Sequence, residues 1–285
     1  MIGKKRQIAG AKIEEIYDPA VGPARGMLRR SLPEGNLRHV RRSPATELTP
    51  WIAHYWMIHW DLGQSAPQLV ESLPHPNVHL VFEDAKAVVY GVQTQKFSRT
   101  LEGRSRVFGV KFRPGGFRPF LDGPVSALAD SSAPARRIFG KDLRALEAIA
   151  FTDGREDDKV QAANEFLIAR APEPDSTVAL AAQLVERILL QPEIRTVEDL
   201  VGLASIPKRR LQRIFHEYVG ASPKWVIRRY RLHELIEKAN AASRLDWAQV
   251  ALELGYFDQA HLINDFKAIL GFTPVEYQKR IPREG

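Results

Sequence analysis

The sequence predicts an α+β protein in which an N-terminal β domain with trailing helices precedes an all-α C-terminal region. The chain has 285 residues, about twice the length of an ordinary domain, so two domains are expected. Short apolar segments fill the first half, whereas apolar residues recur at helical spacing in the last third. Two prolines in the segment 171–176 separate these patterns, which places the domains at residues 1–170 and 176–285.

Four segments of the first domain are predicted to be strands, because each is short, rich in β-branched and aromatic residues, and bounded by turn residues. They cover residues 55–60, 78–82, 88–92 and 107–112, and together they predict an antiparallel barrel or sandwich. The turn sequence Arg113-Pro114-Gly115-Gly116 ends the last of them. Helical spacing over 141–150 and 157–170 predicts the trailing helices, and an arginine-rich stretch is expected to precede the first strand.

Composition and charge narrow the class of function. The net charge of +7 and the isoelectric point near 9.6 predict a polyanionic partner. Basic residues concentrate in 208–231, where eight stand against the single acid Glu217, and in 1–42, where ten stand against four. The absence of cysteine excludes disulfides and thiolate chemistry. No apolar run long enough for a membrane span or a signal peptide occurs, so a soluble cytoplasmic protein is expected.

The C-terminal region contains an internal repeat. At a shift of 51 residues, Leu211 matches Leu262, and the phenylalanine and glycine that follow it also recur. Each copy has the apolar pattern of a short helix, a tight turn and a second helix. Gly255 permits the turn of the second copy, and Asp258 is placed to cap the helix after it. The repeat predicts two helix-turn-helix units.

The second helix of each unit presents a polar face that suits the DNA major groove. Arginine and glutamine bind base edges there, each good pair contributing about 1–3 kcal/mol of discrimination. A helix over 224–241, roughly 27 Å long, joins the units and suits two successive major grooves. A merely solvated helix face is the alternative interpretation. The candidate DNA-binding residues are Lys208, Arg209, Gln212, Arg213 and His216 in the first unit, and Gln259, Ala260, Ile263, Asn264 and Lys267 in the second.

With these residues the C-terminal region resembles the AraC/XylS family of bacterial transcription regulators. The resemblance spans about residues 177–280 and includes Gly220-Ala221-Ser222-Pro223, Ala251-Leu252-Glu253-Leu254-Gly255-Tyr256 and Gly271-Phe272-Thr273-Pro274. It implies a sequence-specific regulator, expected to be an activator and not an enzyme, with a cupin-like effector or dimerisation domain at the N-terminus. Its expected partners are promoter DNA, RNA polymerase, a small-molecule effector and a second copy of the chain. Pro207 departs from the family's usual serine cap, and Asn264 from its frequent arginine.

The effector is the open part of this interpretation. Arg25 and Arg29, followed by Arg30, have the RxxxR spacing that resembles the cyclic di-GMP-binding loop of PilZ domains. The partner motif of that family has only an imperfect match at residues 130–135. Cyclic di-GMP is the specific ligand expected at these arginines. A solvated or DNA-touching basic arm is an equally weighted alternative.

Metal binding, an apolar ligand and catalysis are the alternatives for the N-terminal domain. His75 and His79 would share one face of a strand and could bind a metal, while His54 and His59 would not. Trp51, Trp56 and Trp60 line either an apolar pocket or the core. A barrel enzyme targeted to DNA is a further alternative, but no phosphate loop, GxSxG or HExxH motif occurs. No metal site, cofactor or catalytic residue is predicted.

Overall fold

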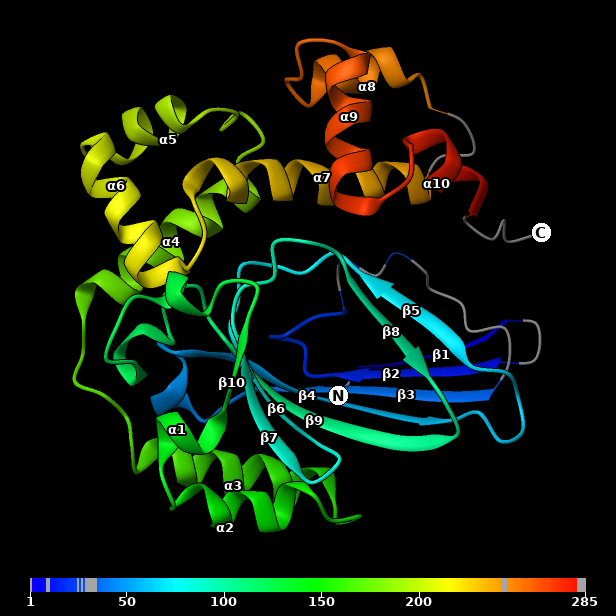
Figure 1. Cartoon of the computed structure of the whole chain (residues 1–285), viewed down its shortest axis with the longest axis vertical. Helices are drawn as coiled ribbons and strands as arrows, with labels where there is room; N and C mark the ends of the chain where they lie inside the picture. Colours follow the sequence, from blue (N-terminus) through cyan, green and yellow to red (C-terminus); the bar gives the residue numbers. More distant parts are fainter. Residues whose placement is uncertain are drawn as a thin grey trace.

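The structure, a computed structural model, describes residues 2–8, 11–24, 26, 28, 35–241 and 245–280. It shows a β-sheet domain with its own helices on one side and a C-terminal helical region on the other (Figure 1), which confirms the predicted α+β class. None of the described helices combines the length and the apolar character needed to cross a membrane.

The β domain contains two sheets. The main sheet has the strand order β1-β2-β3-β4-β9-β6-β7-β10, and β5 pairs with β8 in a separate ribbon. Neighbouring strands are antiparallel except β2 and β3, which run parallel, so the prediction of a purely antiparallel domain is wrong at that pair. The strands are β1 (Ile2–Ile8), β2 (Ala11–Tyr17), β3 (Gly35–Arg42), β4 (Ile52–Asp61), β5 (Gln68–Ser72), β6 (His79–Glu83), β7 (Lys86–Tyr90), β8 (Phe97–Leu101), β9 (Arg104–Phe112) and β10 (Ser132–Pro134).

The first strands lie earlier than the sequence predicted. The structure places β1 and β2 before the arginine-rich stretch, and Arg38, Arg41 and Arg42 belong to β3 itself. β3 has one fully buried apolar residue, Val40, among charged neighbours. Because strand prediction depended on apolar runs, this charged strand was missed.

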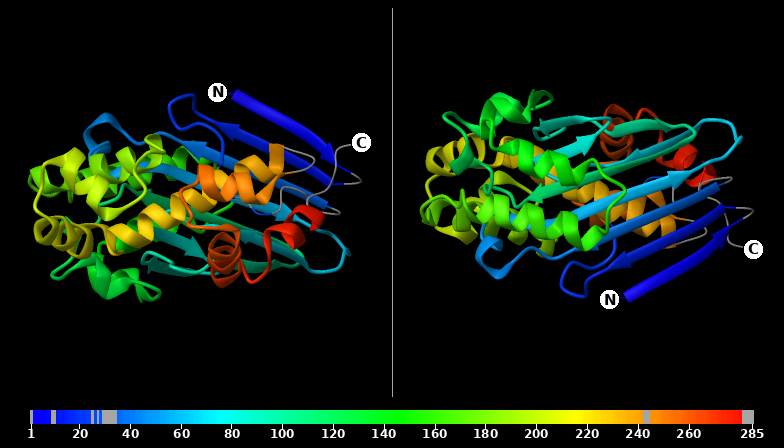
Figure 2. Two further views of the ribbon diagram at one scale, coloured as in Figure 1. Left: turned by 90° about the horizontal axis from the view of Figure 1, so that it is seen from above. Right: turned by 90° about the horizontal axis from the view of Figure 1, so that it is seen from below.

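The lower face of the main sheet is covered by helices. α1 (Ala135–Phe139), α2 (Leu143–Ala150) and α3 (Glu156–Ile168) pack there, as the view from below in Figure 2 shows. Alternate residues of the strands point into this contact, including Tyr55, Met57, Phe108 and Val110, all buried. Burial of so much apolar surface makes this layer the main core of the domain. Three short 3-10 turns accompany it: η1 (Thr46–Leu48), η2 (Arg118–Phe120) and η3 (Val125–Leu128).

The C-terminal region is entirely helical, as predicted. A connection over 169–175 precedes it, and the Asp175 side chain caps the first helix by accepting a hydrogen bond from Thr177 N. The predicted domain limits fall at this connection, although Val178 beyond it still packs in the core of the β domain. The helices are α4 (Ser176–Leu190), α5 (Val197–Ala204), α6 (Lys208–Ile214) with the π-helical turn η4 (Phe215–Val219), α7 (Pro223–Ala241), α8 (Trp247–Glu253), α9 (Gln259–Leu270) and α10 (Pro274–Arg280).

Candidate nucleic-acid interface

The first helix-turn-helix unit consists of α5 and α6. Thr196 and Asp199 form a reciprocal capping box at the start of α5. Leu200, Leu211 and Phe215 are completely buried in one cluster, which fixes the two helices against each other. α6 begins after Pro207 without a side-chain cap, as the sequence predicted, and continues into η4.

The second unit, α8 and α9, repeats this arrangement with a better-defined turn. Gly255 has a φ of 71°, the left-handed conformation expected for it. Asp258 caps α9 by accepting a hydrogen bond from His261 N at 2.7 Å, which confirms the predicted cap. Gly220 and Gly271, one repeat length apart, have φ values of 87° and 81° where the second helix of each unit ends. The duplication in sequence is therefore a duplication in backbone geometry.

The predicted face of α6 is exposed. Arg209, Gln212 and Arg213 are open to solvent, and Arg210, which the sequence analysis did not select, is exposed as well. Lys208 is exposed and its Nζ lies 2.5 Å from Glu198 Oε1. His216 differs from the other four candidates, because its ring Nε2 lies 3.0 Å from Ser126 Oγ of η3 in the β domain. Contact of these side chains with bases stays a prediction.

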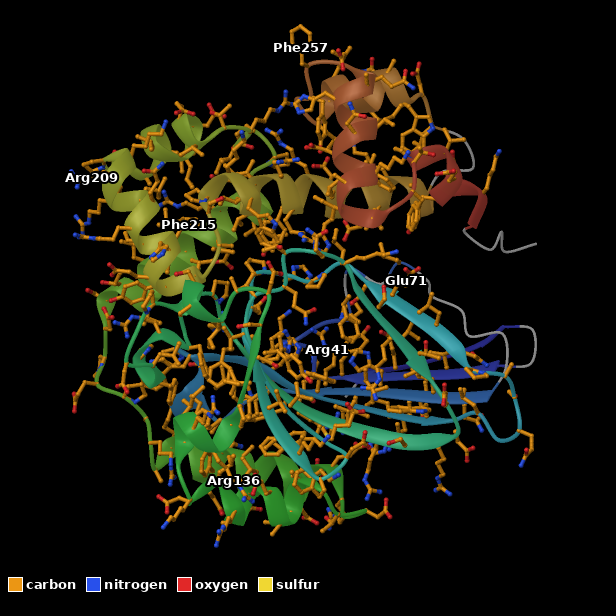
Figure 3. All side chains as sticks on the ribbon, viewed as in Figure 1. Arg41, Glu71, Arg136, Arg209, Phe215 and Phe257 are labelled. Carbon is orange, nitrogen blue, oxygen red and sulfur yellow. The ribbon has the colours of Figure 1, made fainter. Side chains whose placement is uncertain are left out.

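The corresponding face of α9 is less charged. Gln259, Ala260, Asn264 and Lys267 are exposed, while Ile263 is half-buried against the core of this unit. Phe257, in the turn before α9, is 88% exposed and was not among the predicted residues. In the sequence, Phe257 differs from the other apolar residues of this unit only in that it does not follow the apolar spacing of the two helices. Figure 3 shows Phe257 at one edge of the helical region and Arg209 at another, both projecting away from the molecule.

A basic groove separates the two units. It has a volume of about 550 Å³ and is lined from α5 and α6 on one side, α7 at its base, and the start of α9 on the other. Five lining residues are basic and two are acidic. Such a surface favours a polyanion over a neutral ligand. The charged lining residues are Arg195, Glu198, Lys208, Lys224, Arg228, Arg231 and Asp265.

Hydrogen bonds across this groove fix the orientation of the units. Arg195, before α5, donates to Glu253 O at the end of α8 over 2.7 Å, and Arg231 of α7 donates to Arg195 O. Arg228 of α7 makes a two-pronged contact with Asp265 of α9, whose carboxylate is almost fully buried. The two units and α7 therefore form one connected body among the described residues.

The helix α7 also contacts the β domain. Arg229 is completely buried, donates to Thr94 O and lies 4.5 Å above the Trp225 ring. Nearer the other end of the helix, the His233 ring stacks on His75 with 4.3 Å between ring centroids. Burial lowers the pKa of Arg229 to about 10. These contacts link the candidate DNA interface to the β domain.

The three candidate effector residues, Arg25, Arg29 and Arg30, lie outside the described residues. In the imperfect partner motif, Asp130 accepts hydrogen bonds from Thr94 N and Oγ1 at 2.6 Å each, and the following segment pairs as β10.

The histidine pair considered for metal binding does not share a strand face. His79 begins β6, whereas His75 lies in the preceding loop and stacks on His233, so that expectation is corrected. His54 and His59 do fall on opposite faces of β4. Trp51 and Trp60 are buried in the cores, and Trp56 is half-buried. In the described part of the chain, no group of three or more His, Asp or Glu side chains could hold a metal.

Two sequence families match separate parts of the chain. Residues 200–280 match a family described as a helix-turn-helix domain, and residues 40–134 match a domain of unknown function, DUF6597. The C-terminal region therefore contains a helix-turn-helix domain, which its internal repeat predicted. The description of the family that matches residues 40–134 names no activity.

The chain is similar to a curated protein and to solved structures. An uncharacterized HTH-type transcriptional regulator of Haemophilus influenzae is 32% identical over 100 residues, which are 33% of this chain and 32% of that protein. The chain thus spans about a third of the curated relative it matches. ToxT of Vibrio cholerae aligns over 80% of this chain and 99% of its own, with 11% identity and a TM-score of 0.36. The xylose-binding transcription activator XylR aligns over 45% and 39%, with 19% identity and a TM-score of 0.31.

Proposed function

We propose that the chain is a sequence-specific DNA-binding transcription regulator whose β domain binds a small-molecule effector. One observation carries the proposal: a duplicated helix-turn-helix domain exposes a cationic face on the second helix of its first unit. Arg209, Gln212 and Arg213 stand on that face, beside a groove whose charged lining residues are mainly basic. Promoter DNA is the partner that matches this charge and geometry.

The proposal assigns different tasks to the two units. Arg209, Gln212 and Arg213 contact base edges, whereas Lys208 and His216 at the margins of the face contact phosphates. In the second unit, Ala260, Ile263 and Asn264 approach bases, and Gln259 and Lys267 contact the backbone. The first unit then provides most of the discrimination, because its side chains are longer and more cationic.

The test is selection of a binding site from random duplex DNA, followed by titration of wild type and Arg213→Ala. The variant is expected to lose about 1–3 kcal/mol at one base position and to tolerate substitutions there. Arg137→Ala, an exposed arginine on α1, is the matched control and should bind like wild type. Unchanged affinity and specificity in Arg213→Ala would contradict the assignment of the α6 face.

For the effector, the proposal retains cyclic di-GMP at Arg25, Arg29 and Arg30. Its support is the RxxxR spacing and the basic character of residues 1–42. Calorimetry with cyclic di-GMP on the whole chain and on Arg25→Ala tests this directly. Heat in wild type and its loss in the variant support it, and no heat at high micromolar ligand refutes it.

Activation of transcription through RNA polymerase, and pairing of two chains, complete the proposal. The activator role follows from the family resemblance, and it predicts that the protein raises transcript levels from its selected site with purified polymerase. Lower transcript levels at saturating protein would show a repressor instead. Sedimentation across a concentration series tests the dimer.

A further inference from the structure

The upper face of the main sheet, opposite α1–α3, carries a group of basic side chains that the DNA-binding function does not use. Arg41 of β3, His54 of β4, His79 of β6 and Lys111 of β9, here called the basic cluster, come from four adjacent strands. The strand register pairs His54 with Lys111, and Lys111 with His79. Arg41 pairs with Trp56, two residues from His54 on β4. Figure 3 shows Arg41 on this side of the sheet, away from Arg136 of α1.

The cluster has an electrostatic imbalance. Among the described residues, Lys111 has no hydrogen-bond or ion-pair partner, although it is half-buried. Burial and then the charge of Arg41 lower its pKa to about 7. Every neighbour that affects the pKa of His54 or His79 is itself basic. Holding basic groups this close together in a partly buried place is unfavourable, so this arrangement is unusual for a purely structural face.

Hydrogen bonds orient the donors of the cluster. Arg41 Nη2 donates to His54 Nε2 over 3.0 Å, and Arg41 Nη1 donates to Gly22 O over 2.6 Å. Trp56 Nε1 donates to His79 Nδ1 over 3.2 Å. Since burial lowers the pKa of His79 to about 3, its ring is neutral at pH 7 and carries its proton on Nε2. His79 Nε2–H and the Lys111 ammonium thus remain as donors on this face.

An apolar surface adjoins these donors. The Trp56 indole lies across Gly109, where any Cβ would collide with it. Further along the same face, Ile58, Val81 and Val70 of β5 are half-buried and pack against a small apolar core shared by the main sheet and the β5–β8 ribbon. A ligand with a negative head and an apolar or aromatic body matches both parts of this surface.

We propose that the basic cluster binds the negatively charged head of a small organic acid, a carboxylate or a phosphate monoester, with its apolar body against Trp56. The anion supplies the charge that Lys111 lacks and accepts hydrogen bonds from Lys111 and His79. This deepens the effector part of the proposed function and rests on it. The site is separate from Arg25, Arg29 and Arg30, so it does not depend on cyclic di-GMP.

The experiment uses the whole chain and three probes of similar shape: benzoate, phenyl phosphate and the neutral benzamide. Thermal unfolding and calorimetry are measured for wild type, Lys111→Met, and Lys86→Met, which removes an exposed lysine of β7. The expected result is that at least one anion raises the Tm of wild type and Lys86→Met, with at least a tenfold weaker Kd in Lys111→Met. Benzamide should have no effect.

Each outcome decides the proposal. An equal response to benzamide would show that only an apolar pocket is present, and an unchanged Kd in Lys111→Met would place the anion elsewhere; either overturns it. If neither anion raises the Tm or produces heat at millimolar concentration, the proposal is also overturned. Binding of benzoate alone would identify the head group as a carboxylate, and binding of phenyl phosphate alone would identify it as a phosphate monoester. Because none of these measurements involves DNA, failure here is distinguishable from failure of the α6 face in site selection.

Should Lys111→Met fold poorly, His79→Gln provides a second variant. Glutamine removes the imidazole ring and displaces the donor at Nε2, so binding of the anion should weaken a few-fold relative to wild type. An unchanged Kd in His79→Gln would overturn the proposal.

Discussion

Positive charge gathers in two places in this molecule, and the two differ in exposure. On α6, Arg209 and Arg213 are exposed to solvent. On the upper face of the sheet, Arg41 and Lys111 are half-buried, and burial of the Lys111 ammonium costs free energy. Removal of an exposed cation should therefore leave folding unchanged. Removal of a half-buried cation should change both the free energy of unfolding and the binding of a ligand.

The strongest test of the comparison is the double substitution Arg209→Ala with Arg213→Ala. We expect DNA affinity to fall roughly 100-fold, while the free energy of unfolding changes by less than about 0.5 kcal/mol, because both side chains are exposed. Fluorescence anisotropy with the selected site and urea denaturation measure the two quantities. A large loss of stability would show that α6 is held by these side chains and is not a free surface.

On the sheet, Lys111→Met should change the free energy of unfolding and leave DNA affinity unchanged. Its pKa is about 7 in the folded chain and has its ordinary value of 10.5 in the unfolded chain. Between these values the unfolded chain binds a proton that the folded chain does not, so this lysine makes stability rise with pH from about 7 to 10.5. Lys111→Met should flatten that rise and stabilise the protein by about 1–2 kcal/mol near pH 7.

Urea denaturation across this pH range, compared with Lys86→Met, measures the effect. If the free energy of unfolding had the same pH dependence in wild type and Lys111→Met, the lysine would be well hydrated. The cations of the sheet and of α6 would then not differ in exposure.

The two helix-turn-helix units offer a smaller test. Asp258→Ala removes the cap of α9 and should cost about 1 kcal/mol of stability, since its carboxylate holds His261 N. Pro207→Ser introduces a cap on α6 and should change stability by less, because the loss of proline rigidity offsets the new hydrogen bond. Denaturation of both variants gives the values, and equal effects would show that the helix starts are equivalent.

The smallest expected effect is that of Lys267→Ala. Because this exposed lysine of α9 is assigned to phosphate, affinity should fall a few-fold on every sequence, and the salt slope should decrease by about 1. Anisotropy over a series of salt concentrations measures the slope. A change in base preference would assign Lys267 to bases and would make the second unit a discriminating one.

The C-terminal half of the molecule was the more predictable from sequence. Gly255 and Asp258 have the turn and cap that local chemistry requires, and the 51-residue repeat fixed the two units without any long-range information. The exposure of Phe257 was not predicted, because an exposed aromatic residue in a turn does not follow the apolar spacing of a helix.

The β domain was less predictable, since its organisation depends on pairing between distant segments. β3 is rich in arginine and was not identified as a strand, and its parallel pairing with β2 has no local signature. The basic cluster could not be found for the same reason. Its four residues are spread over 71 positions of sequence and meet only through the register of four strands.

The buried guanidinium of Arg229 has a mechanical consequence. α7 is held to the β domain through Arg229 and His233 and to α9 through Arg228, so this helix connects the sheet to both helix-turn-helix units. His75, which stacks on His233, is four residues before His79 of the basic cluster. Because Arg195, Arg228 and Arg231 join the two units to α7, a shift of this helix against the sheet would carry both units with it as one rigid body. A ligand acting in this way would change whether both units reach the DNA together, and not the spacing of half-sites or the bases that each unit contacts.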